Sequence, residues 1–375
     1  MSGPIVALVQ NPRQVHPPEM AVFAEAVPSY DPSRAADESA RLRRTLEDFG
    51  LRVVQPTEVL RSLDRAALVS LAAGAIDAED EERRLLAHKA LSGWTPEDLV
   101  ELVVRRPRLL LRPDPALAAI SPDSSYEAYA LAPLFGLAFP RDHYVDLDGF
   151  LVIGRLRRED RRREVAVMRA VVERLRESPA EVAIDAPDYL EGGDVVAYGS
   201  VAVVSAGFRT TSAAAALLLD PLRRRFDHVV LLQDRFRRPD QFHLDHWLAL
   251  GPSVALAACD RLDAVEMVSC HTVDIDLEPG GNGSQQRTLR DTLRSLDLRI
   301  VPLDPDDLEG FIGNALFLPG SSAVVLPDST ASSMRRTLEG LGFETVTVPF
   351  SEHQRQRGGI HCATNFLRLD PRGNP

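Results

Sequence analysis

The stretch Leu316-Phe-Leu-Pro-Gly-Ser-Ser-Ala-Val-Val-Leu326 consists of two short apolar runs on either side of Gly320-Ser321. Apolar runs joined by a glycine-containing turn are typical of a β-hairpin. After this hairpin, the spacing of apolar residues predicts a helix over residues 330–341 and a strand over residues 345–348. Hairpin, helix and strand in this order indicate an α/β unit.

The same order of elements recurs along the chain. A hairpin, a helix and a strand are predicted at residues 145–153, 159–175 and 182–184, and again at residues 195–204, from about 211, and at 229–232. Near the N-terminus, a strand, a helix and a strand are predicted at residues 5–9, 35–49 and 51–54. Recurrence of one unit favours a repeat architecture. The copies share little sequence, so we predict a repeat of structure.

One segment differs from these units. In residues 57–112, leucines recur at helical spacing and strand signals are almost absent. Thr95-Pro-Glu-Asp98 is a typical helix start, with Thr95 as the N-cap and Pro96 at the first helical position. We therefore predict a small all-helical insertion at residues 57–112, within a single catalytic α/β domain that spans residues 1–375.

The composition argues against several classes of protein. The chain of 375 residues carries a formal net charge of -12, which argues against nucleic acid or an anionic membrane as its main partner. Three cysteines are too few for a disulfide framework, so we expect a reducing, cytoplasmic environment. We expect no signal peptide and no membrane span, because no apolar run is long enough for either.

The chemistry is expected near the C-terminus, at Arg357-Gly-Gly-Ile-His-Cys-Ala-Thr-Asn365. Two glycines let the backbone adopt angles that other residues avoid and approach a ligand closely. Cys362 follows them at once and has polar neighbours. It is either a small buried hydrophobe or a thiolate nucleophile, and its spacing alone leaves both interpretations open.

Three further stretches carry ionisable side chains, and they are Phe139-Pro-Arg-Asp142, Glu191-Gly-Gly-Asp194 and Phe242-His-Leu-Asp245. Taken singly, each acid could be an ordinary turn residue. In an extended segment, residues two apart point to the same face. We therefore expect His243 and Asp245 to face one site together. His246 would then point away and is interpreted as structural.

Together these stretches supply a thiol, an imidazole and several carboxylates. Serine hydrolases need no such cluster of acids, and cysteine proteases need only the cysteine and the histidine. Several carboxylates suit a planar cation with many N–H donors, and a guanidinium offers its donors in a fixed fork that pairs with carboxylates. A guanidinium is also a poor electrophile, so chelating acids and a proton donor must assist a thiolate that attacks its carbon.

In this order, the stretches resemble the motifs of the guanidino-group modifying superfamily, and within it most closely those of arginine deiminase. Phe-Pro-Arg-Asp142 is similar to that family's Phe-Thr-Arg-Asp, and Glu-Gly-Gly-Asp194 and His-Leu-Asp245 match as they stand. Arg-Gly-Gly-Ile-His-Cys362 resembles Arg-Gly-Gly followed by Cys, and Gly207-Phe-Arg-Thr210 resembles Gly-Glu-Arg-Thr. The helical segment is similar in position to the insertion of arginine deiminases, so the resemblance spans nearly the whole chain.

The resemblance implies a fold and a set of roles. The fold is a five-bladed, pseudo-symmetric α/β propeller, the pentein fold, with its site on the central axis. Cys362 would be the nucleophile and His243 the general acid and base. The acids would hold the guanidinium and the histidine, and they are Asp142, Asp245, Glu191 and, supporting Glu191, Asp194. Two arginines would bind the α-carboxylate of the substrate, and they are Arg209 and Arg357.

The resemblance also implies a mechanism that needs no metal and no organic cofactor. The thiolate of Cys362 attacks the guanidinium carbon while His243 protonates the departing amine, and water then releases the covalent amidino-cysteine. A free cysteine has a pKa of about 8.5, so a nearby cation must favour the thiolate. The bound substrate is the hypothetical source of that charge.

The sequence departs from the arginine deiminase pattern at two positions. His143 stands where that family has Pro, and His246 stands where it usually has Thr. Ile-His-Cys-Ala-Thr-Asn365 is nearer to agmatine deiminases, peptidylarginine deiminases and amidinotransferases. The guanidino chemistry is therefore better supported than any one substrate, although Arg209 and Arg357 favour a substrate with a carboxylate.

Several functional hypotheses stay open at this point. The first is a hydrolase that releases ammonia and citrulline from free arginine or a close derivative. The second is an amidinotransferase that passes the amidino group to an amine, and the third is a hydrolase that releases a larger amine. A non-catalytic propeller that binds a partner is of another class, and it needs neither Cys362 nor His243. The expected partner is a small guanidino substrate, and a homo-oligomer is left open.

Overall fold

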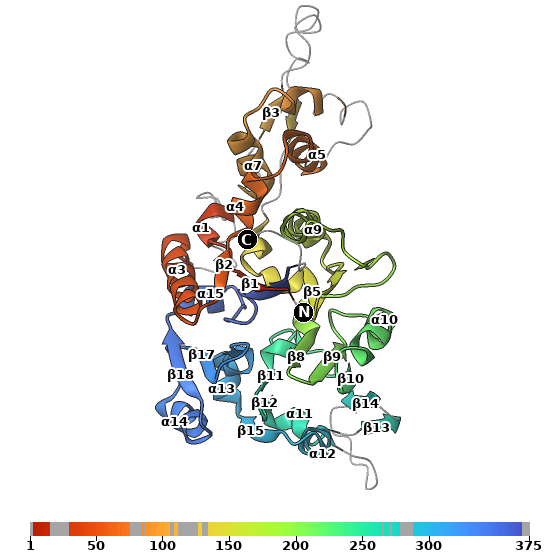
Figure 1. Ribbon diagram of the computed structural model, residues 1–375, viewed down its shortest axis with the longest axis vertical. Coiled ribbons are helices and arrows are strands. Elements are labelled where there is room, and N and C mark those ends of the chain that lie inside the picture. The colour runs from red at the N-terminus through yellow and green to blue at the C-terminus, as the bar shows by residue number, and fades with distance from the viewer. Residues whose placement is uncertain are drawn as a thin grey trace, which may run out of the picture.

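The architecture comes from a computed structural model that describes residues 3–15, 30–75, 85, 88–105, 109–111, 127–129, 134–264, 266–269, 272–277 and 288–369. Five units of hairpin, helix and strand are arranged in a ring (Figure 1). In each unit, the hairpin strands pair antiparallel, and the strand after the helix pairs in parallel with the second hairpin strand. The predicted five-bladed, pseudo-symmetric α/β propeller is therefore confirmed.

Four of the units are built from successive segments of the chain. Each has two hairpin strands, a helix and a third strand; in the first unit these are β5 (Tyr144–Leu147), β6 (Phe150–Ile153), α9 (Arg162–Arg176) and β7 (Val182–Ala183). The second unit has β8 (Val195–Tyr198), β9 (Val201–Ala206), α10 (Ser212–Arg223) and β10 (His228–Asp234), and the third has β11 (Leu248–Gly251), β12 (Val254–Ala258), α12 (Leu289–Ser295) and β15 (Arg299–Leu303). The fourth has β16 (Leu316–Phe317), β17 (Ala323–Pro327), α14 (Ser332–Gly340) and β18 (Glu344–Val348). Both strands of the β11–β12 hairpin are buried along their whole length. It therefore lacks the alternation that marks a strand in sequence.

The fifth unit closes the ring with both ends of the chain. Its hairpin is formed by β19 (Asn365–Arg368) and β1 (Ile5–Leu8), which pair antiparallel although they lie at opposite ends of the sequence. α3 (Pro32–Asp48) follows, and β2 (Arg52–Val54) then pairs in parallel with β1. The predicted strand, helix and strand near the N-terminus are thus part of a unit that the C-terminal strand completes.

Apolar side chains between sheets and outer helices stabilise each unit. On α9, buried residues recur at a spacing of three and four and include Val167, Met168 and Val171. They belong to one core cluster with Leu151 and Ile153 of β6. Since burial of one such side chain contributes about 1.5–3 kcal/mol, this face anchors the helix to its sheet.

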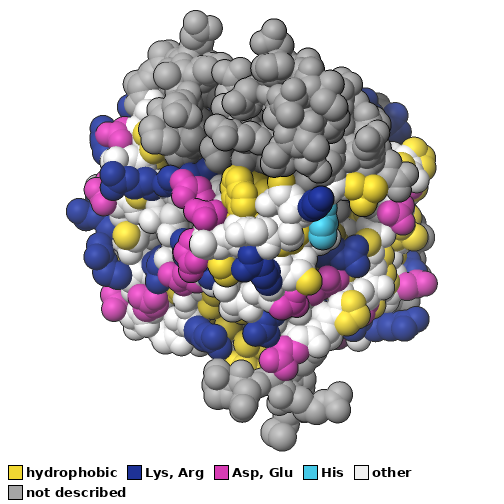
Figure 2. All heavy atoms as spheres, turned by 90° about the horizontal axis from the view of Figure 1, so that it is seen from above, with side chains coloured by type: hydrophobic (Ala, Val, Ile, Leu, Met, Phe, Trp, Pro, Cys, Tyr) yellow, Lys and Arg dark blue, Asp and Glu magenta, His cyan; other side chains and the backbone are white. Residues whose placement is uncertain are grey.

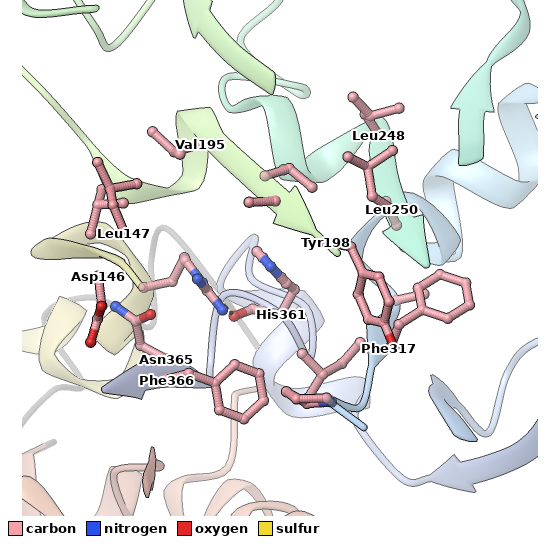
Figure 3. Close-up of a pocket in the computed structure, with 18 residues that line it drawn as sticks. Asp146, Leu147, Val195, Tyr198, Leu248, Leu250, Phe317, His361, Asn365 and Phe366 are labelled. Carbon is pink, nitrogen blue, oxygen red and sulfur yellow. Dashed lines mark hydrogen bonds between the residues drawn. The ribbon is translucent and has the colours of Figure 1, made fainter. Parts of the chain in front are cut away.

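The inner strand of each unit faces the axis of the ring. Residues of β5, β8, β11, β16 and β19 line a cavity of about 140 Å³ (Figure 3). Short 3-10 turns lead into four of these strands, and they are η3 (Pro140–Asp142), η5 (Gly192–Asp194), η6 (Leu244–His246) and η7 (Ile312–Asn314). The loops before the five inner strands therefore meet at one end of the axis.

A helical segment projects from one side of the ring (Figure 1). It contains α4 (Pro56–Arg61), α5 (Arg65–Ala75) and α7 (Pro96–Arg105), and Thr95 Oγ1 accepts a hydrogen bond from the Asp98 backbone N at 3.2 Å, as predicted for an N-cap. The range 57–112 also contains β3 (Leu109–Leu111), which pairs antiparallel with β4 (Glu127–Tyr129). The prediction of an all-helical segment is therefore wrong at its C-terminal end, because a short apolar run suits either a helix or a strand.

Within the residues described above, no helix combines the length and the apolar character needed to cross a bilayer. Figure 2 shows acidic and basic side chains interspersed over one face of the molecule. This face thus lacks, in its described part, the continuous basic area typical of nucleic-acid binding.

Candidate active site

The loops before the inner strands bring together six of the predicted site residues. All six are at most 4% exposed, and they are Asp142, Glu191, Asp194, His243, Asp245 and Cys362. Three come from the turns η3, η5 and η6, and Cys362 lies just before β19. The ring therefore brings residues as far apart in sequence as Asp142 and Cys362 into one buried cluster.

Glu191 and His243 form the tightest pair of the cluster. His243 Nε2 lies 2.8 Å from Glu191 Oε2, and Glu191 Oε1 also accepts a hydrogen bond from the Arg157 backbone N at 2.9 Å. Burial by itself would raise the pKa of Glu191, but the hydrogen bond and the charge of His243 lower it to about 2. Glu191 is therefore a carboxylate at neutral pH.

His243 is held in its protonated form. Burial by itself would lower its pKa, but the carboxylates of Asp142, Glu191 and Asp194 raise it to about 9. Its Nδ1 has no hydrogen-bond partner among the described residues and lies 3.6 Å from Asp142 Oδ1. At neutral pH this nitrogen therefore carries a proton that can be donated.

Cys362 is cradled by Asn314, a residue that the sequence motifs do not include. Asn314 Nδ2 donates to Cys362 Sγ at 3.1 Å, and the Cys362 backbone N donates to Asn314 Oδ1 at 3.0 Å. Burial, with the charges of Asp245 and Asp142, raises the pKa of Cys362 well above its usual range. In the free protein Cys362 is therefore a neutral thiol, held in place by the amide. No sequence signal marks Asn314 except its place before the inner strand of its unit.

Asp245 lies between the thiol and His361. Its Oδ2 is 2.9 Å from His361 Nδ1 and 3.5 Å from Cys362 Sγ. Burial by itself would raise the pKa of Asp245, but the hydrogen bond and charge of His361 lower it strongly. Asp245 Oδ1 has no hydrogen-bond partner among the described residues. His361, which the sequence analysis does not assign to the site, thus fixes the orientation of Asp245.

Asp194 ties two of the loops together. Its Oδ1 accepts a hydrogen bond from the Leu244 backbone N at 3.1 Å, which joins the Glu-Gly-Gly-Asp turn to the His-Leu-Asp turn. Burial and the charge of Glu191 raise the pKa of Asp194 to about 7. The contact joins the two loops, and the support of Glu191 by Asp194 that the resemblance implies stays a prediction.

The glycines of the motifs are needed for close packing. A Cβ on Gly193 would lie 2.6 Å from His243 Nδ1, and a Cβ on Gly359 would lie 2.5 Å from Asn314 Oδ1. Neither glycine has a positive φ, whereas Arg357 does, at 64°. The expectation of unusual backbone angles at the glycines is therefore wrong, and the close approach of catalytic side chains explains them.

His246 faces the thiol, and the prediction that it points away is wrong. Its Nε2 lies 3.8 Å from Cys362 Sγ, and its Nδ1 lies 3.3 Å from the Asp240 carbonyl oxygen. Alternation of side chains holds only in extended backbone. Here η6 (Leu244–His246) is a 3-10 turn, which rotates His246 towards Cys362.

The two predicted carboxylate-binding arginines occupy different places. Arg209 Nη1 lies 3.4 Å from Glu191 Oε1, and its guanidinium lies 4.8 Å from the centre of the Phe242 ring. Arg357 is exposed, makes no ion pair with the residues that the structure describes, and lines a pocket of about 540 Å³ together with His246. The structure therefore brings Arg209 to the buried cluster and leaves Arg357 at the pocket beside it.

A second buried network fixes Oδ2 of the Asp142 carboxylate. Arg161 Nη1 donates to Asp142 Oδ2 at 2.8 Å, and Arg161 Nε donates to Glu164 Oε2 at 3.0 Å. His143 Nε2 lies 3.0 Å from the same Glu164 oxygen. The unexpected His143 thus has a partner, and only Oδ1 of Asp142 is left without a hydrogen bond among the described residues.

The axial cavity is lined by His361, whose ring also contacts Asp245. His361 and Asn365 face it from the loop and strand that follow Ile360, and Tyr198 and Phe317 close it from other strands (Figure 3). Arg141 also lines it, and its Nε lies 3.5 Å from the His361 carbonyl oxygen. His361 therefore lines the axial cavity and also contacts Asp245 of the buried cluster.

Two triplets of the cluster have ligand atoms close enough to hold a metal ion, and they are His243 with Asp245 and His246, and Asp142 with Glu191 and His243. Both triplets depend on His243. Because His243 is protonated at neutral pH and hydrogen-bonded to Glu191, it offers no free lone pair to a metal. The donor set thus fits a metal poorly, and catalysis without a cofactor stays a prediction.

Five α/β units in a ring, with a cysteine, a histidine and carboxylates converging at one end of its axis, define a guanidino-group modifying enzyme of the pentein fold. The sequence profile of the arginine deiminase family matches residues 29–368, and the chain belongs to that family.

Solved structures resemble the whole fold. One is dimethylarginine dimethylaminohydrolase of Pseudomonas aeruginosa in complex with citrulline, with 17% identity, a TM-score of 0.53, and coverage of 98% of this chain and 100% of that chain. Another is the N-terminal domain of ArgZ, an arginine dihydrolase from the ornithine–ammonia cycle in cyanobacteria, with 14% identity, a TM-score of 0.56, and 98% of both chains covered. At these identities the likeness supports the fold alone. No curated protein sequence matches the chain.

Proposed function

We propose that the protein hydrolyses the guanidino group of free arginine or a close derivative, releasing ammonia and citrulline through a covalent amidino-cysteine. One observation carries the proposal. Asp142 Oδ1 and Asp245 Oδ1 are buried acceptors without a hydrogen bond among the described residues, in the same cluster as Cys362 and the protonated His243. A buried, unpaired acceptor costs about 1–3 kcal/mol, and more when it is charged. A guanidinium supplies planar N–H donors that would pair with both oxygens.

The first half of the reaction forms the covalent amidino-cysteine. The Asp142 and Asp245 carboxylates orient the guanidinium, and the Cys362 sulfur forms a bond with its central carbon. His243 Nδ1–H then protonates the departing nitrogen, which leaves as ammonia, and an amidino-cysteine remains. The Asn314 amide, 3.1 Å from Sγ, stabilises the sulfur while it carries negative charge.

The second half uses the neutral His243 that the first half produces. His243 Nε2 keeps its proton and its hydrogen bond to Glu191, so Nδ1 now has a lone pair that accepts a proton from water. The resulting hydroxide attacks the amidino carbon, and the C–S bond breaks. The remaining hydroxyl proton of the intermediate passes to solvent, which also converts the released ammonia to ammonium, and the ureido product leaves. His243 is again protonated, ready for the next turnover.

The tail of the substrate would lie towards the two arginines. Arg209 lies at the edge of the buried cluster, and Arg357 lines the neighbouring pocket. A cationic rim of this kind favours a substrate that bears a carboxylate. We therefore place the α-carboxylate of arginine, or of a close derivative, with Arg209 and Arg357.

The alternative reactions differ from this one only in the leaving group or in the molecule that accepts the amidino group from Cys362. An amidinotransferase would use an amine in place of water, and another hydrolase would release a larger amine. Membership in the arginine deiminase family favours release of ammonia with water as the acceptor. A non-catalytic propeller would have no use for a thiol cradled by Asn314 beside a protonated histidine.

Mass-spectrometric product analysis tests the proposal. The purified protein is incubated with L-arginine, with and without glycine, beside a Cys362→Ala variant. Citrulline and ammonia from the native protein alone are expected. Ornithine with a guanidino product of glycine would establish the amidinotransferase instead. Neither turnover nor an adduct at Cys362 with any guanidine tested would overturn the enzymatic proposal.

A further inference from the structure

The thiol proton of Cys362 needs an acceptor before the sulfur can attack. Cys362 is a neutral thiol in the free protein, because it is buried among carboxylates. His243 cannot take this proton, because it is already protonated on both nitrogens at neutral pH. Another base must therefore lie within reach of Sγ.

The geometry around His246 leaves a lone pair facing the sulfur. His246 Nδ1 lies 3.3 Å from the Asp240 carbonyl oxygen, which can only accept, so Nδ1 carries the proton of the neutral ring. The unprotonated nitrogen is then Nε2, which lies 3.8 Å from Cys362 Sγ. Hydrogen bonds of catalytic groups are often long in the free protein and shorten when substrate binds.

The other acceptor near the sulfur is a weaker base. Asp245 Oδ2 lies 3.5 Å from Cys362 Sγ. The same oxygen already accepts from His361 Nδ1 at 2.9 Å, and this contact lowers the pKa of Asp245. Asp245 is therefore a weaker base than an imidazole, whose ordinary pKa is about 6.5.

We propose that His246 is the general base that removes the proton from Cys362, in a division of labour in which His243 serves only the leaving group and the water. This proposal rests on the proposed guanidine chemistry. The Sγ–H bond breaks, the proton passes to Nε2, and the electron pair on sulfur forms the bond to the guanidinium carbon. When the C–S bond later breaks, the thiolate regains the proton from Nε2, so both histidines end in their starting states.

Charged substrate would trigger this transfer. The carboxylates of Asp142 and Asp245 disfavour a thiolate while they are uncompensated. A guanidinium that pairs with their free oxygens supplies positive charge next to Sγ and removes this penalty. The proton would then move from sulfur to His246 only in the complex.

The surroundings of His246 include ionisable groups on two sides. On the side of the cluster they are Asp142, His243, Asp245 and Cys362. On the side of the 540 Å³ pocket they are Arg238, Asp240, Cys259, Asp260, Glu309 and Arg357. Burial, with the charge of His243, lowers the pKa of His246, so its ring is neutral at pH 7 and has a free lone pair.

The experiment follows alkylation of Cys362 by iodoacetamide from pH 5 to pH 10, with and without a saturating guanidine that is not turned over. The modified peptide is quantified by mass spectrometry, so the exposed Cys259 does not interfere. Native protein, His246→Gln and His246→Thr are compared, and His228→Gln is the control because His228 is exposed on β10. Folding of each variant is checked by thermal unfolding. Two substitutions of His246 are used so that the test still stands if one variant does not fold.

The expected result is that the guanidine accelerates alkylation of the native protein and of His228→Gln at pH 7. Both His246 variants should lose about tenfold or more of this rate and shift its rise to higher pH, and their kcat on arginine should fall about 100-fold or more. Alkylation profiles of both variants that coincide with the native one would overturn the proposal, even if arginine is turned over. If a bound guanidine accelerates alkylation of Cys362 in the native protein but not in the His246 variants, and no guanidine is turned over, the Cys362–His246 pair is supported and the proposed function fails.

Discussion

The substitution Glu191→Gln tests whether one carboxylate holds His243 in its acid form. Glu191 Oε2 lies 2.8 Å from His243 Nε2, and the pKa of His243 is about 9 against a usual value near 6.5. A hydrogen bond to a charged group contributes about 1.5–3 kcal/mol. Since about 1.4 kcal/mol corresponds to one pKa unit, loss of the charge should bring the pKa of His243 down to about 7–8.

The consequence for activity has a definite sign. In the proposed mechanism His243 acts as an acid in its protonated form, so activity should be lost as the pH rises through its pKa. The alkaline limb of kcat/KM for arginine should therefore move from about pH 9 to about pH 7–8 in Glu191→Gln. Activity at pH 6 should change less, because His243 is protonated there in both proteins.

Two measurements check this prediction. The pH dependence of kcat/KM is recorded for the native protein, for Glu191→Gln, and for Glu344→Gln, a control in which an exposed glutamate is changed. The pKa of His243 is also measured directly by NMR in a Cys362→Ala background. An alkaline limb and an NMR titration that both stay near pH 9 in Glu191→Gln would refute the reasoning.

Three other substitutions have defined outcomes. Burial raises the pKa of Asp194 to about 7, so its ionisation destabilises the fold as the pH rises from about 4 to 7. Asp194→Asn should therefore increase the free energy of unfolding, measured by urea unfolding, by up to about 4 kcal/mol at pH 8. At pH 4 the same substitution should hardly change it. Asn314→Ala removes the donor 3.1 Å from Cys362 Sγ, so kcat on arginine should fall about 100-fold with little change in KM, and an unchanged kcat would rule out this stabilisation. Arg161→Gln leaves Glu164 without its buried cation, so the free energy of unfolding should fall by about 3–5 kcal/mol, and a loss below about 1 kcal/mol would contradict the assignment of a tight buried network around Asp142.

Local patterns predict much of the propeller and part of the cluster. Gly-containing turns between apolar runs mark the hairpins at β5–β6, β8–β9 and β16–β17, because these features depend on neighbouring residues. The motifs around Asp142, Glu191, His243 and Cys362 mark the loops that converge, since each precedes an inner strand. Their joint chemistry, a thiol with an imidazole and carboxylates, points to a guanidinium without any knowledge of distances.

What the sequence by itself determined is thus the repeated unit, the reactive side chains and the kind of substrate that they suit. Tertiary structure decided the closure of the ring by β19 and β1, the cradle that Asn314 forms for Cys362, the rotation of His246 towards the sulfur, and the exposed place of Arg357. The physical reason is that these features depend on which loops meet at the axis and on how one 3-10 turn rotates a side chain. Such contacts join residues far apart in the chain, and only packing of the five units fixes them.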